Sequence, residues 1–318
     1  MIALSLPVRR ILEGGVFCHV AATTPRGPHV TPLVFALAGD RLWVTTSRGS
    51  VKAAAWRRDD RVAGVVRDGE ESVTFAGRAA WHDALDPGTW MRSILEGPLL
   101  TLAAARFTRK NARFFAGYAV DADRVPFAWT PPGRVFVELR LDRWALLGRE
   151  GGIHDAWGEW PDARPSAATF RRPTRTDPLV HLPRDIRAAL GIGGDGVLAV
   201  SGSDGPAALP VRWTVDRSGL VAGAPEDVLA LAGASTERPP VALAMDRASS
   251  WRARDMVGAM ARGEGELASV DRLTSGATAA RAVLRGAGAD GEGAVAIGIR
   301  AERLVWWRGW QSGTVEVA

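Results

Sequence analysis

Residues 28–52 read PHVTPLVFALAGDRLWVTTSRGSVK, and this stretch decides the fold. A Pro-led run over residues 32–37 meets a tight turn at Gly39-Asp40, and a second strand-like run follows over residues 42–46, which is typical of a β-hairpin. A hydroxyl-rich turn then leads into a helical segment that begins at Val51. The stretch therefore predicts a hairpin, a turn and a short helix with a lysine in its first turn.

The second half of the chain repeats the order of these elements more faintly. The amphipathic segment at residues 6–14 resembles the one at residues 182–191, and a Pro-led hairpin follows each of them. Long final strands are expected at residues 134–147 and 295–307. Because a preserved order of elements marks a duplication, the sequence predicts two copies of one β-barrel unit in tandem.

This repeat sets the expected fold class and domains. We expect a mainly β protein with short helices, of the α+β class, built from two tandem β-barrels. Residues 1–148 would form the first barrel with the candidate cofactor loop, residues 149–178 a linker, and residues 179–318 a degenerate second barrel. The linker is rich in Gly, Pro, Arg and Asp, and we expect its Trp157 and Trp160 to pack on a surface.

Composition narrows the class of protein. Cys18 is the only cysteine, so no internal disulfide and no cysteine-based zinc site can form. The apolar runs are all shorter than the roughly twenty residues that cross a bilayer. The first arginines follow a short apolar piece, unlike the order in a secretory signal. We therefore expect a cytoplasmic protein without a membrane partner.

The net charge of +5 is weak evidence for an anionic macromolecular partner, because solubility alone tolerates an excess of this size. Lys52 and Lys110 are the only lysines, and the preference for arginine is most simply explained by a GC-rich genome. We expect no nucleic-acid partner. One helical stripe could attract an anionic ligand such as a substrate phosphate, or could simply be solvated. It consists of Arg106, Arg109, Lys110 and Arg113.

Other chemistries lack a supporting motif. The five histidines are His19, His29, His82, His154 and His181. No two of them stand four residues apart, so a helical zinc motif is absent and we predict no metal site, although clustering in space stays open. A single histidine could serve as an axial haem ligand. No nucleophile elbow supports Ser-His-Asp catalysis.

The order helix, strand, hairpin, helix, hairpin, helix, strand resembles the split β-barrel of the pyridoxamine 5'-phosphate oxidase-like, flavin-binding family. The resemblance is best over residues 15–81 and is carried by residues 28–35, 42–52 and 59–62. Members of that family typically bind a flavin between the two barrels of a dimer. The resemblance thus implies a pseudo-dimer within one chain, and further dimerisation stays open. The C-terminal Arg/His arrangement that holds the substrate in true pyridoxamine-phosphate oxidases is not recognisable here.

The resemblance also implies roles for individual residues. The residues that it assigns to the cofactor are His29, Thr31, Thr45, Thr46, Ser47, Arg48, Ser50, Lys52 and Arg78. A flavin phosphate needs hydroxyl groups, N–H groups at a helix start and cations, all of which residues 45–52 offer. Ser50 and Lys52 would bind the phosphate with Arg48 as a second cation, and the alternative is a Ser-capped surface helix with a solvated lysine.

Two further assignments concern the flavin ring. His29 and Thr31 would meet the ring edge, and the alternative for His29 is a strand end facing water. Arg78 would reach either the pyrimidine edge of the ring or a bound substrate, or would be a solvated barrel residue. No side chain stands out as a catalytic acid or base.

The second half contrasts with the first at the phosphate position. Residues 221–228 contain no lysine there and carry Glu226 and Asp227, which would repel a phosphate. We therefore expect one cofactor per chain, with the second barrel completing the wall of the first site. Three tryptophans could form that wall or anchor the C-terminal strand. They are Trp306, Trp307 and Trp310.

From these residues and the resemblance, we predict a flavin-dependent oxidoreductase that moves hydride to or from a small organic substrate. FMN is the expected cofactor, with the deazaflavin coenzyme F-420 and haem as alternatives. In such chemistry the cofactor makes and breaks the bonds, while the protein binds and orients. The alternative function is a non-catalytic haem- or flavin-binding protein of the same fold.

Overall fold

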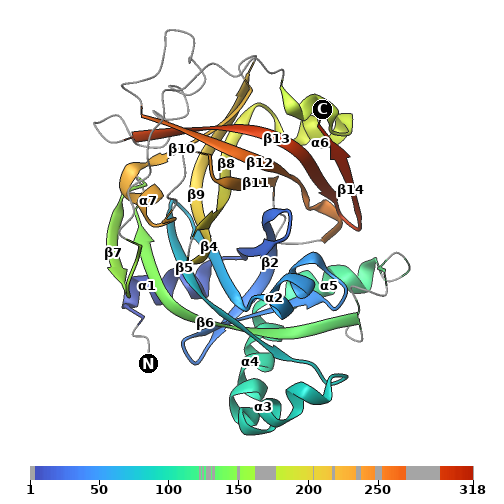
Figure 1. Ribbon diagram of the computed structural model, residues 1–318. Coiled ribbons are helices and arrows are strands. Elements are labelled where there is room, and N and C mark those ends of the chain that lie inside the picture. The colour runs from blue at the N-terminus through green and yellow to red at the C-terminus, as the bar shows by residue number, and fades with distance from the viewer. Residues whose placement is uncertain are drawn as a thin grey trace.

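The computed structural model describes residues 4–121, 123, 125–126, 130, 133–148, 151–161, 177–202, 204–216, 219–233, 238–247, 253–269 and 294–317. Within these ranges the chain forms two barrels, one from each half of the sequence (Figure 1). No helix in this part of the chain has the length and apolar character needed to span a bilayer.

The first barrel closes six antiparallel strands. Its elements are α1 (Leu6–Gly14), β1 (Phe17–Thr24), β2 (Gly27–Ala38), β3 (Arg41–Ser47), α2 (Val51–Arg58), β4 (Arg61–Asp68), β5 (Glu71–His82), α3 (Trp90–Leu95), α4 (Gly97–Lys110), α5 (Ala112–Val120), β6 (Arg134–Leu147) and β7 (Ile153–Trp157). The sheet order is β3-β2-β1-β4-β5-β6-β7, and pairing of β3 with β6 closes the barrel. The expected turn between β2 and β3 is present, since Gly39 and Asp40 both have positive φ, at 58° and 57°.

The second barrel has the same topology. Its elements are α6 (Arg184–Leu190), β8 (Gly193–Gly202), β9 (Gly205–Asp216), β10 (Gly219–Pro225), α7 (Glu226–Ala230), β11 (Pro240–Arg247), β12 (Val257–Ser269), β13 (Ala294–Arg308) and β14 (Gln311–Glu316). The order β10-β9-β8-β11-β12-β13-β14, closed by β10 with β13, reproduces the first sheet strand for strand. The predicted fold class and tandem repeat are therefore confirmed.

The repeat extends to the strand register. A bulge interrupts the β5–β6 ladder at Gly77, and an equivalent bulge interrupts the β12–β13 ladder at Gly263. At the closure of each barrel, Thr46 pairs with Val135 and Ala224 pairs with Val295. Thr46 of β3 therefore corresponds to Ala224 of β10, and the two hairpins match position by position.

The predicted linker contains an element that the sequence reading did not foresee. Strand β7 pairs with β6, with Trp157 opposite Trp144, and so extends the first sheet. Trp160 packs against the core of the second barrel, and the Arg143 guanidinium lies 5.1 Å from its ring centre. Residues 162–176 of the predicted linker lie outside the described residues. The domain boundaries at residues 148 and 178 stay a prediction.

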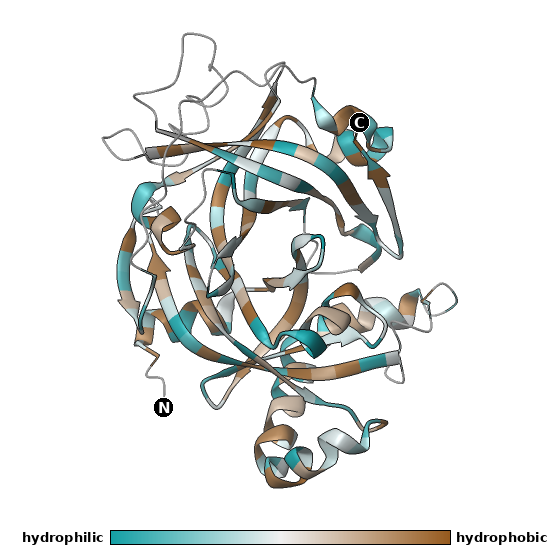
Figure 2. Ribbon diagram, in the orientation of Figure 1, coloured by the Kyte–Doolittle hydropathy of each residue, from teal (hydrophilic) through white to brown (hydrophobic). Residues whose placement is uncertain are grey.

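The barrels meet through outer strand faces that carry small side chains. This interface buries a cluster distinct from the two barrel interiors, and its members include Ala21, Val30, Ala63, Val65, Ala199, Ala208, Ala242, Ala244 and Met260. Polar bonds cross the same interface, because His19 Nε2 lies 2.6 Å from Asp246 Oδ1 and Arg67 donates to the carbonyl of Gly196 at 2.7 Å. Figure 2 shows apolar stretches along the strands of both barrels. The fused pair is thus a pseudo-dimer whose interface combines an apolar cluster with a few polar contacts.

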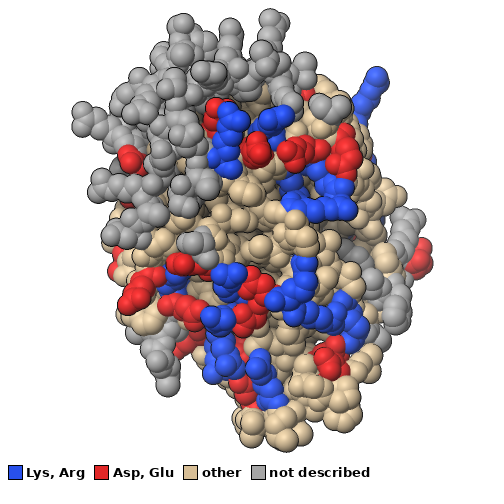
Figure 3. Space-filling view, in the orientation of Figure 1, with Lys and Arg blue, Asp and Glu red and all other residues tan. Residues whose placement is uncertain are grey.

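Charged groups on the outside follow no simple segregation. On the face shown in Figure 3, basic and acidic side chains lie next to one another. Apolar side chains are also exposed on α3, where Met91, Ile94 and Leu95 protrude from the short helix. Helix α4 packs against β2 and β3 on one side and contacts α3 on another.

The two equivalent bulges generate a prediction about stability. A Cβ on Gly77 would lie 1.9 Å from the Arg140 carbonyl oxygen, and one on Gly263 would lie 1.9 Å from that of Arg300. We expect Gly77→Ala and Gly263→Ala each to lower the free energy of unfolding by about 1–3 kcal/mol, because the backbone must shift to admit the methyl group. Urea unfolding measures the loss. Gly152→Ala, where nothing lies within 4 Å, is the matched control, and a similar loss there would contradict the explanation.

Candidate functional site

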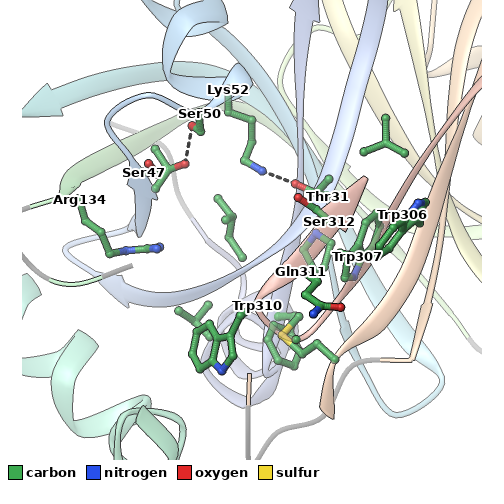
Figure 4. A pocket seen from close by; sticks show the side chains of 18 of the residues that line it. Thr31, Ser47, Ser50, Lys52, Arg134, Trp306, Trp307, Trp310, Gln311 and Ser312 are labelled. Atoms are coloured by element: carbon green, nitrogen blue, oxygen red, sulfur yellow. Dashed lines mark hydrogen bonds between the residues drawn. The ribbon is translucent and has the colours of Figure 1, made fainter. Parts of the chain in front are cut away.

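A cavity of about 330 Å³ opens where the two barrels meet. Its volume lies within the range of pockets that hold small molecules. The first barrel contributes Phe17, His29, Thr31, Pro32, Leu33, Val34, Thr46, Ser47, Ser50, Lys52, Phe114, Tyr118 and Arg134, and the second contributes Met256, Val305, Trp306, Trp307, Gly309, Trp310, Gln311 and Ser312. In Figure 4, Ser47, Ser50 and Arg134 lie across the cavity from Trp306 and Trp307, while Trp310 lies at the bottom of the view.

The turn between β3 and α2 is built as the sequence predicts. Ser50 caps α2, because its hydroxyl accepts the Ala53 N–H at 3.1 Å. The same hydroxyl lies 2.9 Å from Thr46 Oγ1, so the strand end and the helix start are held together. Ser47 and Ser50 both line the cavity. The hydroxyl groups and the start of α2 therefore meet at one edge of the pocket.

Lys52 is buried rather than solvated, so the surface-helix alternative is wrong for this residue. It follows the cap by two residues, lines the cavity and donates to Thr31 Oγ1 (Figure 4). Burial, together with the charge of Arg134, lowers the pKa of Lys52 to about 7. A buried ammonium of this kind gains much from an anionic partner, because that partner replaces the lost hydration.

Arg134 is a second cation at the pocket, and it was not among the residues predicted from the sequence. Its guanidinium donates to Thr45 at 2.8 Å to the hydroxyl and 2.7 Å to the carbonyl. Burial lowers its pKa, but a guanidinium remains charged at neutral pH. The available signal was its place as the first residue of the predicted strand 134–147, which pairs with β3 at Ser47.

His29 is buried near two positive charges, those of Lys52 and Arg262. Burial, and then the charges of Lys52 and Arg262, lower the pKa of His29 well below its ordinary value. The imidazole is therefore neutral at pH 7 and offers one donor and one acceptor. The alternative of a strand-end histidine facing water is wrong, because the side chain lines the cavity.

Three of the predicted site residues lie outside the cavity lining. Arg48 forms an ion pair with Asp83, and Arg78 is exposed and bonds Asp60 at 2.8 Å. Thr45 serves the site only by holding Arg134. Sequence neighbourhood placed Arg48 close to Lys52, but the turn directs its side chain to a different partner.

The opposite wall comes from β13 and β14. Trp306, Trp307 and Trp310 face the cavity beside Gln311 and Ser312 (Figure 4). Trp310 makes an edge contact with Tyr118 across the barrel junction, with ring centres 5.1 Å apart. Burial raises the pKa of Tyr118 to about 12, despite the nearby positive charge. The wall is thus aromatic, although Trp306 also packs on the core of the second barrel and Trp307 on the cluster between the barrels.

The equivalent position in the other half of the pseudo-dimer is a hollow of about 320 Å³. Residues 223–225 (Gly, Ala, Pro) replace residues 45–47 (Thr, Thr, Ser), and α7 begins directly after Pro225. The basic groups at this hollow are engaged, since Asp195 lies 3.5 Å from Arg67 and 3.0 Å from Arg212. The described residues that line this second hollow include no lysine and a single hydroxyl side chain, that of Ser72.

The basic stripe on α4 lies at a separate place. Arg106, Arg109 and Lys110 line a hollow of about 340 Å³ together with Glu13. Lys110 donates to the Leu12 carbonyl at 3.2 Å and lies over the Phe35 ring. Burial lowers the pKa of Lys110 to about 8. Lys110 is thus partly engaged by its own barrel rather than fully solvated.

Comparison with known proteins links the first barrel to a family. Residues 7–101 match the sequence model of the family described as pyridoxamine 5'-phosphate oxidase. The matched segment holds the hairpin, the capped helix and Lys52, and the second barrel repeats its topology. The first barrel is therefore similar in sequence to this family, and the second barrel shares the topology of the first.

Several solved structures are similar to one part of this split-barrel protein. A putative pyridoxamine 5'-phosphate oxidase from Listeria innocua is 15% identical over 44% of this chain and 95% of its own, with a TM-score of 0.29. An FMN-binding pyridoxamine 5'-phosphate oxidase-related protein from Nostoc punctiforme is 18% identical over 43% and 75%, with a TM-score of 0.31. A FAD-binding protein from Mesorhizobium loti is 18% identical over 45% and 94%, with a TM-score of 0.32. No curated protein matches the chain.

The lowered pKa of Lys52 gives a testable pH dependence. Above pH 7 the amine of the free protein is neutral, so binding a phosphate dianion there requires uptake of a proton. We expect the affinity for FMN to fall as the pH rises from about 7 to about 9, since the flavin phosphate itself has its second pKa near 6. Lys52→Met should bind FMN more weakly by about 1–3 kcal/mol at pH 7 and lose this slope.

Fluorescence titration at several pH values measures both effects. Lys110→Met is the matched control, because Lys110 is the only other lysine and lies away from the cavity. It should keep both the affinity and the slope of the unmodified protein. An unchanged slope in Lys52→Met would remove Lys52 from the site.

Proposed function

We propose that this protein is a flavin-dependent oxidoreductase that binds one FMN-type cofactor between its barrels and acts on a small organic substrate. The observation that carries the proposal is the buried Lys52. It lies in the first turn of α2, next to the hydroxyl groups at the start of that helix, on one side of the inter-barrel cavity. The family pattern over residues 7–101 supports the same cofactor class. Coenzyme F-420 and haem remain the alternatives that the binding test separates.

The residues at the cavity fit the two ends of such a cofactor. Ser47, Ser50, Lys52 and Arg134 would hold the phosphate, because hydroxyls and cations converge at that edge. The indole wall would pack against the ring. Trp307 lines the cavity and packs on the apolar cluster between the barrels, which would hold its ring in place against the ligand.

A bound flavin supplies two-electron hydride chemistry, and the protein supplies binding and orientation. The barrel interface excludes water from one face of the cavity, because the apolar cluster between the barrels continues to Val305 and Trp307. His29 is neutral at pH 7, and the pKa of Tyr118 lies at about 12. At that pH both side chains can donate hydrogen bonds, but neither gives up its proton. The pocket therefore positions the reactants, and the substrate or solvent provides any proton.

One observation favours a second candidate, a flavin or haem carrier without turnover. Among the described residues, the cavity lining includes no carboxylate, and Lys52 is the lining residue whose pKa lies near neutral pH. A carrier needs no proton-transfer group. Steady-state reduction assays separate the two functions: turnover of the bound cofactor with a hydride donor and an acceptor supports the oxidoreductase, and a reducible cofactor without turnover supports the carrier.

The absorption spectrum of the purified protein tests the cofactor class directly. We expect a flavin spectrum, or its appearance on titration of the apoprotein with FMN to one equivalent per chain. Bands of a deazaflavin or of haem would instead identify those alternatives. A colourless protein that none of the three saturates contradicts the proposal.

Arg134 and Arg48 provide a matched pair for the phosphate end. We expect Arg134→Gln to weaken FMN binding by about 1–3 kcal/mol and to leave riboflavin, which lacks the phosphate, nearly unaffected. Arg48→Gln should change neither affinity, because Arg48 pairs with Asp83 outside the cavity. Isothermal titration with both flavins measures this. Equal losses for the two ligands in Arg134→Gln would place its effect on folding rather than on the phosphate.

A further inference from the structure

Three side chains converge at a second place in the first barrel, where the α3–α4 insertion meets the sheet. His82 is the last residue of β5, Glu138 lies within β6, and Glu96 stands between α3 and α4. The exposed fractions of their side chains are 3% for His82, 0% for Glu138 and 21% for Glu96. None of the three lines the cofactor cavity. The cluster is therefore buried and independent of the proposed flavin site.

The distances in this cluster are long for hydrogen bonds and match those between the ligand atoms of one metal ion. His82 Nε2 lies 3.5 Å from Glu96 Oε2 and 3.5 Å from Glu138 Oε2. Neither His82 Nε2 nor Glu96 Oε2 has a hydrogen-bond partner among the described residues. Zinc bonds to nitrogen and oxygen of about 2.1 Å place tetrahedral ligand atoms about 3.4 Å apart. The observed spacing matches that edge.

The other imidazole nitrogen sets the tautomer. Ser93 Oγ lies 3.0 Å from the Thr89 carbonyl, to which its hydroxyl donates, and 3.2 Å from His82 Nδ1. Since its proton is used, Ser93 accepts from Nδ1–H, and in the neutral imidazole the lone pair of Nε2 then faces two carboxylate oxygens. That arrangement is repulsive unless a cation, either a metal ion or a proton on Nε2, lies between them. Fixing the ring through the second nitrogen is the usual support of a metal-bound histidine.

The carboxylates are held in place through their remaining oxygens. Glu138 Oε1 forms an ion pair with Arg41 at 2.7 Å and accepts from Arg140 at 2.6 Å, while Oε2 accepts a longer hydrogen bond of 3.2 Å from Arg140. Glu96 Oε1 accepts from Arg140. Burial raises the pKa of Glu138, but its neighbours outweigh burial and lower that pKa to about 2. Both oxygens that face His82 thus belong to oriented carboxylate groups.

We propose that His82, Glu96 and Glu138 bind one divalent transition-metal ion of the zinc class. Imidazole ligation favours zinc and its neighbours, whereas magnesium and calcium prefer oxygen ligands alone. The ion fastens the α3–α4 insertion to β5 and β6, so its role is structural. Because Arg41 and Arg140 already balance the carboxylates, the site binds metal more weakly than four unopposed ligands would.

Cobalt titration of the full-length, tag-free protein after EDTA treatment tests this site. We expect one Co²⁺ per chain, with the visible absorption of a low-coordinate ion, displaced by Zn²⁺. His82→Gln and Glu96→Gln should abolish the visible bands. Ser93→Ala, which removes only the support of the imidazole, should weaken Co²⁺ binding by about 10–100-fold. His181→Gln and Glu302→Gln change exposed residues of the same types and are the controls.

The thermal midpoint provides a second readout. Zn²⁺ should raise the midpoint of the unmodified protein and of both controls, and leave that of Glu96→Gln unchanged, because a ligand that binds only the folded state stabilises it. FMN affinity should stay the same in Glu96→Gln, which separates this site from the flavin proposal. An unmodified protein that takes up neither Co²⁺ nor Zn²⁺, or Glu96→Gln and Ser93→Ala proteins that bind like the controls, would overturn the proposal. The cluster would then be an ion pair of a protonated His82.

Discussion

The close approach of the two barrels is the constraint on which the rest of the structure depends. Alanines dominate the buried contact between them, and Ala21, Ala63, Ala242 and Ala244 are all fully buried. Side chains that end at Cβ let two strand faces pack tightly without voids. That contact brings β13 and β14 against the hairpin of the first barrel, and the cavity exists only because of it.

The cavity destabilises the positive charges that line it, and an anionic ligand would offset that effect. Removal from water destabilises the charged form of a lysine side chain, as the lowered pKa of Lys52 shows. Arg134 adds a second positive charge at the same edge. An anionic ligand relieves both, so the same groups that lower the stability of the free protein favour the bound state. The second half lacks this arrangement, because Pro225 and α7 follow each other without the hydroxyl-bearing turn.

Local sequence carried much of the prediction. The hairpin, the Ser50 cap and the helix that follows depend on turn residues and alternation within a few positions, and the structure has all three. The tandem repeat could be predicted for the same reason, since each copy has its own local pattern. Strand β7 was missed because its five residues sit in a Gly- and Pro-rich segment without a clear period.

The sequence by itself determined the two-barrel fold, the family resemblance of the first barrel and the place of the Ser50-capped turn, because these follow from short-range chemistry repeated in order. Only the tertiary structure decided which side chains meet. Arg134 joined the pocket in place of Arg48, and His82 met Glu96 and Glu138, because strand pairing and helix packing join positions far apart in the chain. Burial decided the rest, since the shifted pKa values of Lys52 and His29 arise from surroundings that no local pattern specifies.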